Sequence, residues 1–176
     1  NQTGADAAYA VIPAGYKVSA VNYGQEAVAS GAFSSAVGTA QRSRYVLRAA
    51  TTSDSPSRLT SDGVGSGNGN NTVNMPAESI FVVKGIAAAK DTNVAVADVK
   101  VWEFTATFRR GALASSVELV GAATVTELVA DAGASAWTLA ITADIVNGGV
   151  SFVGTGATGT TIRWVASVDT TEVVNG

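Results

Sequence analysis

The stretch VKVWEFTATFRR, residues 99–110, decides the fold of this chain. Its side chains alternate with a period of two: Trp102, Phe104, Ala106 and Phe108 on one phase, Val101, Glu103, Thr105 and Thr107 on the other. A period of two places alternate side chains on opposite faces of a β-strand. The sequence therefore predicts a strand over 99–110 with one apolar, aromatic face in the core and Glu103 facing solvent.

Further strands with the same alternation are predicted on both sides of this one. They are expected at 45–49, 79–84, 116–120, 123–130, 136–143, 149–153 and 160–168. Asn147-Gly148, between two of them, is a strong hairpin signal. Residues 125–136 leave a helical turn open as an alternative, although their Val and Thr content disfavours it. Short strands between turn signals predict an all-β fold, with an antiparallel β-sandwich of the jelly-roll type over 44–176.

Composition excludes several classes of functional site. The 176 residues suffice for one domain or a small domain with an appendage. The chain has no Cys, which excludes disulfides, iron–sulfur clusters and thiolate zinc sites. It has no His, which excludes a Ser-His-Asp triad and the commonest transition-metal ligand. Because the chain begins at Asn1 rather than Met, we expect it to be a fragment of a longer protein.

The charge pattern points away from nucleic acids and membranes. The formal net charge is −3, and no basic stripe suited to nucleic-acid phosphates stands out along the sequence. No apolar run approaches the ~20 residues that a membrane span needs. We therefore expect neither nucleic-acid binding nor membrane insertion.

The N-terminal third carries a seven-residue repeat. In GQEAVASGAFSSAVGTAQ, residues 24–41, Gly24, Gly31 and Gly38 are evenly spaced, with small residues in register at Ala27, Ala29, Ser34 and Ala36. Glycine at the repeating position argues against a coiled coil, because each helical Gly costs about 1 kcal/mol relative to Ala. A β-roll or solenoid with glycine at its corners fits better, and a Gly/Ala-rich linker is the alternative.

This repeat resembles a known family pattern. The segment ASGAFSSAVGTA, residues 29–40, is similar to the head repeat of trimeric autotransporter adhesins, which also occurs in bacteriophage fibres. Downstream, the chain resembles the C-terminal region of phage tail-fibre or related virion-fibre proteins. The segments concerned are QRSRYVLRAAT (41–51), SDG (61–63), FRRGA (108–112), AWTLAITAD (136–144) and TIRWVASVDTTEV (161–173).

The resemblance implies a homotrimer in the virion, acting outside the host cell at its surface. Its expected partners are other copies of the chain, other virion proteins and a host surface glycan or protein. Because solenoids usually need at least ~3 repeats to bury a core, we expect this segment to be completed either by further repeats of the longer protein or by neighbouring chains. Residues 1–43 are expected to be a trimerising stalk. The expected trimer interface comprises Gly24, Ala27, Ala29, Gly31, Ser34, Ala36 and Gly38.

A long polar loop, residues 51–74, is expected from its length to be either functional or mobile. It is the candidate receptor-binding element. Its candidate binding residues are Asp62, Asn68, Asn70 and Asn71. Together with Asp54 they offer oxygen ligands that suit calcium, but the spacing matches no calcium-binding motif. We expect no metal and no cofactor. The GxGxxG match at 154–159 is expected to be a hairpin loop, because a strand rather than a helix follows it.

Catalysis is not expected. Glu103, Glu118, Glu127, Asp131 and Asp144 are the candidates for a sugar-hydrolysing carboxylate pair, whose separation the sequence does not give. Trp102, Trp137 and Trp164 suit either core packing or sugar stacking, and their place on apolar strand phases favours the core. The expected function is therefore a structural and receptor-binding module. The alternatives are a purely structural or decoration fibre of the virion and a glycan-depolymerase fragment.

Overall fold

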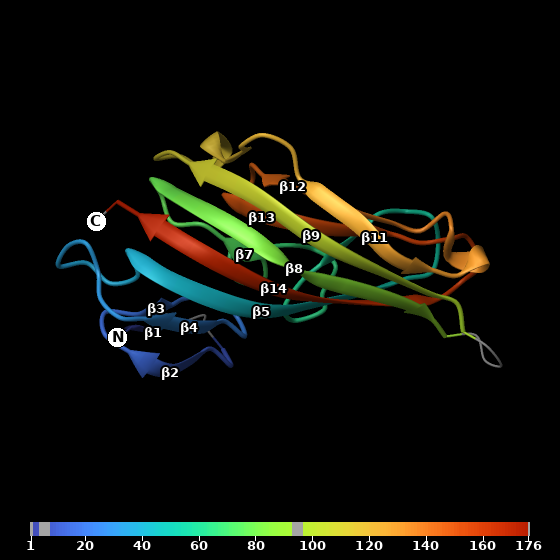
Figure 1. The fold of residues 1–176 in the computed structure, drawn as a ribbon, viewed down its shortest axis with the longest axis horizontal. Coiled ribbons are helices and arrows are strands. Elements are labelled where there is room, and N and C mark those ends of the chain that lie inside the picture. The colour runs from blue at the N-terminus through green and yellow to red at the C-terminus, as the bar shows by residue number, and fades with distance from the viewer. Residues whose placement is uncertain (1, 4–7, 93–96, 176) are drawn as a thin grey trace.

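The structure, a computed structural model, describes residues 2–3, 8–92 and 97–175 (Figure 1). Over these residues the chain is all-β, and its only helical parts are two 3-10 turns, η1 (Ala114–Ser116) and η2 (Ala132–Ala134). Most strand pairings are antiparallel. The predicted all-β class with mainly antiparallel sheets is confirmed. No helix in the described residues has the length and apolar character that a membrane crossing requires.

The larger sheet has the order β10-β9-β8-β14-β5-β4-β2, with β11 also paired to β9. Its strands are β2 (Val11–Gly15), β4 (Glu26–Ala29), β5 (Ala40–Thr51), β8 (Ser79–Asp91), β9 (Val99–Arg110), β10 (Glu118–Leu119), β11 (Thr124–Ala130) and β14 (Ile162–Val174). β5, β8, β9 and β14 are the long members and run along the longest axis of the molecule (Figure 1). β14 lies between β5 and β8 and pairs with both over nearly its whole length.

The smaller sheet covers one face of the larger one. It consists of β6 (Ser57–Leu59), β7 (Val73–Asn74), β12 (Thr138–Asp144) and β13 (Gly149–Thr155). Aromatic rings meet between the sheets: Phe104 on β9 contacts Phe152 on β13, with ring centroids 5.3 Å apart. Trp102 and Trp164 stack at 5.6 Å within the same core. We call the face of the large sheet that packs in this core the inner face and the opposite face the outer face.

The N-terminal segment extends the large sheet. β4 pairs antiparallel with β5, and β2 pairs parallel with β4. The short strands β1 (Gln2–Thr3) and β3 (Ser19–Ala20) form a separate parallel pair. Val18, Ala20, Ala27 and Ala29 form a small apolar cluster of their own. Since β5 begins at Ala40, it crosses the expected boundary at residue 43, and one sheet joins the two predicted parts.

A buried polar network fastens this segment to the large sheet. The Gln25 side-chain amide donates to the Ser43 hydroxyl at 2.8 Å, and the Asn22 amide donates to the Tyr45 hydroxyl at 3.2 Å. The Gln41 amide on β5 donates to the Ser19 carbonyl of the N-terminal segment at 2.9 Å and to the Glu172 carboxylate on β14 at 2.7 Å. These bonds compensate the donating amide groups for the water that they lose on burial. The junction is therefore held by specific hydrogen bonds as well as by strand pairing.

The observed elements match the predicted pattern most closely where alternation is strong. β9 has the predicted bounds, and the Asn147-Gly148 turn joins β12 to β13, with Gly148 at a φ of +78°. The strand predicted at 45–49 lies within the longer β5, and the strand predicted at 79–84 is the first part of the longer β8. The helical alternative for residues 125–136 holds only over η2. The segment 116–120 was predicted too long, since it contains the end of η1 and the two-residue β10.

Within residues 24–41, β4 and the first two residues of β5 are strand, and residues 30–39 between them are irregular, with bends at 30 and over 33–39. Gly38 has a φ of +76°, and a Cβ atom there would lie 2.7 Å from Cβ of Ser19. Glycine is therefore required at this position by both backbone conformation and close packing.

Candidate functional site

The predicted loop residues are brought together but are bonded mainly to one another. The Asn71 side-chain amide donates to both carboxylate oxygens of Asp62, at 3.1 and 3.0 Å. The Asn68 side-chain oxygen accepts from the backbone N–H groups of Asn70 and Asn71. Asn70 has an exposed side chain, and its carbonyl accepts a hydrogen bond from the N–H of Tyr23. In this arrangement the polar atoms fix the shape of the loop and tie it to the N-terminal segment.

The pKa of Asp62 follows from the same contacts. Partial burial of the carboxyl favours its protonated form, but the hydrogen bonds from the Val64 N–H and the Asn71 amide outweigh burial and hold the pKa below its ordinary value. Asp62 is therefore a carboxylate at neutral pH and an acceptor within the loop. The described residues contain no group of three or more acidic side chains that could hold a metal ion.

The predicted interface residues of the repeat differ in their accessibility. Ala27, Ala29 and Gly38 are buried within the chain itself. Gly24, Gly31 and Ser34 are partly accessible, and the Ser34 carbonyl accepts a hydrogen bond from Lys17 Nζ at 2.6 Å. Ala36 is exposed. Contact with another copy of the chain through this segment would therefore centre on residues 31–36.

Four of the five candidate carboxylates serve as partners of neighbouring groups. Glu118 pairs with Arg109, and Glu127 pairs with Lys100 at 3.0 Å. Asp131 accepts from the N–H of Val99 at 3.0 Å. Asp144 is buried, and its pKa is lowered because hydrogen bonds from Asn147 and the charge of Arg58, 2.6 Å away, outweigh the effect of burial. The fifth, Glu103, lies exposed on the outer face.

The three tryptophans belong to the core, as predicted. Trp102, Trp137 and Trp164 are all buried, and Trp164 Nε1 donates to the Thr51 hydroxyl at 3.0 Å. Because none of the rings is accessible, none can serve as a sugar-stacking platform in this conformation. The GxGxxG segment leads from β13 to β14, and its last glycine precedes a strand rather than a helix. The predicted hairpin loop is wrong, because β13 and β14 belong to different sheets and the segment crosses between them.

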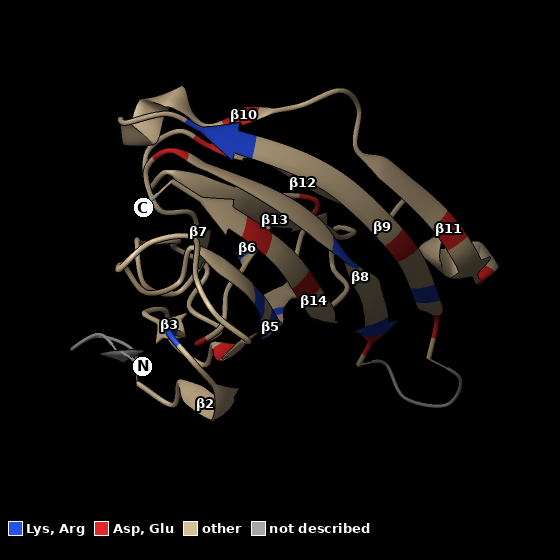
Figure 2. Cartoon of the chain, turned by 60° about the vertical axis from the view of Figure 1, so that its left-hand side comes forward, with Lys and Arg blue, Asp and Glu red and all other residues tan. Residues whose placement is uncertain are grey.

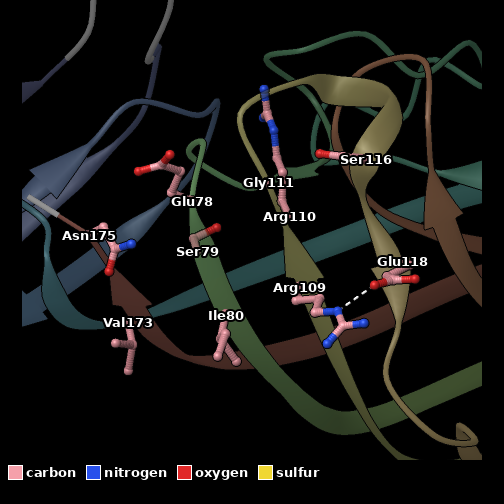
Figure 3. Close-up of a pocket in the computed structure, with 10 residues that line it drawn as sticks. All are labelled: Glu78, Ser79, Ile80, Arg109, Arg110, Gly111, Ser116, Glu118, Val173 and Asn175. Carbon is pink, nitrogen blue, oxygen red and sulfur yellow. Dashed lines mark hydrogen bonds and ion pairs between the residues drawn. The ribbon is translucent and has the colours of Figure 1, made fainter.

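A hollow of about 540 Å³ opens at one end of β8, β9 and β14 (Figure 3). Glu78 and Asn175 lie on one side of it, and the Arg109–Glu118 pair lies on the other, as the dashed line in Figure 3 shows. Glu78 has a φ of +54°, an unfavourable conformation for a residue with a side chain. The lining offers carboxylate, amide and guanidinium groups beside Ile80 and Val173, which suits a polar ligand with hydroxyl groups.

The outer face of the large sheet concentrates the positive charge of the chain. Strand register places seven of the eleven Lys and Arg residues on it: Arg42, Arg44, Arg48, Lys84, Lys90, Arg109 and Arg163. The acidic residues of this face are Glu26, Glu103, Glu118 and Asp169. Figure 2 shows the basic positions on β5, β8 and β9. The outer face is thus net positive on a chain that is net negative.

Two hollows lie side by side on the outer face. One, of about 230 Å³, lies among Arg42, Arg44, Lys84, Asp169 and Thr171. The other, of about 430 Å³, lies beside it among Lys84, Asp169, Glu103, Thr105 and Ser167. Lys84 and Asp169 line both, so the hollows lie next to each other.

Sequence reasoning missed this surface because its residues come from strands that only the register brings together. The spacing of Arg42, Arg44 and Arg48 along one strand was the available signal, since alternate residues share a face. Comparison with known proteins adds no relative: no family model matches the chain, and no curated protein matches it in sequence.

Proposed function

We propose that this chain is a structural and receptor-binding module of a virion fibre of the bacteriophage tail-fibre type, which attaches the particle to the host cell surface as a homotrimer. It acts by binding and not by catalysis. The resemblance of residues 29–51, 108–112, 136–144 and 161–173 to fibre proteins is the reason for the fibre assignment.

The observation that carries the binding role is the uncovered outer face of the large sheet. A sheet face left in water ordinarily carries dispersed polar residues of both signs. This one combines seven cations with half-exposed Val46, Ile86 and Val165 and with two adjacent hollows. Apolar side chains together with charge on one accessible face are typical of surfaces that contact a partner. The engagement of four candidate carboxylates in structural contacts supports binding over catalysis.

The finer architecture is part of the proposal. The two packed sheets suit a jelly-roll-like β-sandwich tip, and the parallel pairs β1–β3 and β2–β4 suit one coil of a β-roll stalk. A single coil buries only a small apolar cluster, so contact with two further copies would complete it.

Binding of fluorescently labelled protein to cells and to virions tests the function. We expect saturable binding to the surface of host cells from a panel of bacterial strains, without release of oligosaccharides from their surface glycans. Binding to purified virus capsids but to no cells would instead favour a structural decoration fibre. Release of oligosaccharides would favour a depolymerase.

A further inference from the structure

The hollow beside Arg42 is flanked by positive charge on both sides. In the strand register Asp169 on β14 lies opposite both Arg44 on β5 and Lys84 on β8. Since neighbouring strands lie about 4.8 Å apart, Arg44 and Lys84 are roughly 10 Å apart at their Cα atoms. Arg42 lies two residues before Arg44 on β5, about 7 Å away along the strand. Three cations from two strands thus surround one carboxylate.

Only one of these cations is neutralised. Arg44 pairs with Asp169 at 3.2 Å and lies opposite Glu26 on its other side. Within the described part of the chain, neither Arg42 nor Lys84 has an acidic side-chain oxygen within 4.0 Å. These two side chains flank a hollow of about 230 Å³ from opposite sides. A negatively charged group placed between them would relieve the repulsion between like charges and gain charge-assisted hydrogen bonds.

The adjoining hollow adds groups of another kind. Glu103 and Asp169 present acceptors there, and Thr105 and Ser167 present hydroxyl groups that can donate or accept. A ligand spanning both hollows must therefore carry an anionic group for Arg42 and Lys84 and hydroxyl donors for the carboxylates. A saccharide that bears a carboxylate or phosphate group has both features.

The residues of the outer face also argue against two other partners, a second copy of the chain and a nucleic acid. A second copy of the chain placed face to face would bring two net positive surfaces together, which is unfavourable. Single-stranded nucleic acids are commonly bound by stacking of their bases on aromatic side chains. The described large hydrophobic side chains that are exposed on this face, such as Val46, Ile86 and Val165, include no aromatic ring for base stacking.

We infer that the outer face of the large sheet binds an acidic saccharide, whose anionic group lies between Arg42 and Lys84 and whose hydroxyl groups contact Asp169 and Glu103. This inference rests on the proposed receptor-binding function and names the class of receptor. A carboxylate and a phosphate would both form charge-assisted hydrogen bonds with Arg42 and Lys84, and the experiment distinguishes between them.

Binding of the full chain to immobilised polysaccharides, followed by biolayer interferometry, tests the inference. The probes are polygalacturonic acid as the carboxylate, a phosphomannan as the phosphate, and dextran as the neutral control. We expect binding to at least one acidic probe, weak or no binding to dextran, and weaker binding as NaCl is raised, because salt screens exposed charges.

Two double variants with equal charge changes locate the site. Arg42→Gln with Lys84→Gln removes the cations that flank the hollow and should weaken binding to the acidic probe by about tenfold or more. Lys90→Gln with Arg163→Gln removes two cations that lie opposite each other at the far end of the same face, and should change binding by less than about twofold. Equal thermal melting of both variants would show that folding is intact.

Several results would overturn the inference. Equal losses in the two double variants would mean that the whole face attracts anions without a site. Binding to dextran as tight as binding to the acidic probes would show that charge does not determine the binding. Tighter binding to a duplex DNA fragment than to these probes would show that the ligand is a nucleic acid. Cell binding that Arg42→Gln with Lys84→Gln leaves unchanged, without binding to either acidic probe, would refute this inference but not the proposed function. Probe binding without binding to any cell would refute the proposed function instead.

Discussion

Glu172 is a carboxylic acid in the interior, and its surroundings make stability depend on pH. The side chain is 3% exposed and accepts hydrogen bonds from Gln41 and Thr170, but the described residues place no cation beside it. Burial raises its pKa above the ordinary value of 4.5, against the opposing effect of these hydrogen bonds. The folded protein therefore binds this proton more tightly than the unfolded chain does.

The sign of the pH dependence follows from that difference. As pH rises from 4.5 through the raised pKa of the folded protein, the unfolded chain has lost its proton and the folded protein still holds it. The free energy of unfolding falls over this window and is constant above it. Glu172→Gln, which resembles the neutral acid, should flatten this dependence and be more stable than wild type at neutral pH. Urea denaturation across the window checks this, with exposed Glu118→Gln as the control. Parallel curves for wild type and Glu172→Gln would contradict it.

The core role of Trp164 gives a second prediction at this scale. Its ring is 1% exposed and stacks on Trp102, so Trp164→Ala should cost about 3–5 kcal/mol of unfolding free energy. The neighbouring Val165 is 49% exposed on the outer face. Val165→Ala should therefore change stability by no more than about 0.5 kcal/mol. Guanidinium denaturation of both variants tests this. Similar losses of unfolding free energy in the two variants would show that the inner and outer faces of the large sheet are assigned incorrectly.

At the scale of elements, the loop between β6 and β7 is expected to act as a structured unit. Asn71 is 2% exposed and bonds Asp62 through its amide nitrogen and the Asn68 N–H through its amide oxygen. Asn71→Ala would leave both partners without these bonds, at a cost of about 1–3 kcal/mol. The exposed neighbour provides the control, since Asn70→Ala should cost less than about 0.5 kcal/mol. Chemical denaturation measures both, and an unaffected Asn71→Ala would mean that the loop network contributes nothing to stability.

Elements with strong alternation were the ones that the sequence predicted well. β9 alternates aromatic and polar residues, and both its bounds and its buried face were predicted from that pattern. β8 was predicted only to residue 84, because beyond it Gly85 and the alanines at 87–89 differ too little in size to show a phase. The outer-face site was not predicted, because Lys84 and Arg42 become neighbours only through their shared partner strand β14. The residue pattern of a strand shows which side chains share a face. The order and register of the strands then decide which residues of different strands lie side by side on that face.

For the whole molecule, we expect assembly into a homotrimer through the exposed part of the repeat. Light scattering on the purified chain should give three times the 17.6 kDa chain mass at micromolar concentration. Ala36→Glu, on the exposed part of the repeat, should shift this mass toward that of the monomer by placing three carboxylates at the interface. Ala77→Glu, at an exposed position outside the repeat, should not. A monomer for wild type at every concentration would contradict the prediction.

The central position of β14 has a consequence for synthesis on the ribosome. Trp164 on β14 bonds Thr51 on β5 across 113 positions of sequence. Translation proceeds at about 5–20 residues per second, so roughly 6–23 s pass between the synthesis of Thr51 on β5 and that of Trp164 on β14. During that interval β5 and β8 each expose an edge that another nascent chain could join. Neighbouring ribosomes on one messenger hold such chains close together. The order of strands thus makes translation speed a determinant of yield, because slow decoding of residues 52–161 prolongs the aggregation-prone interval.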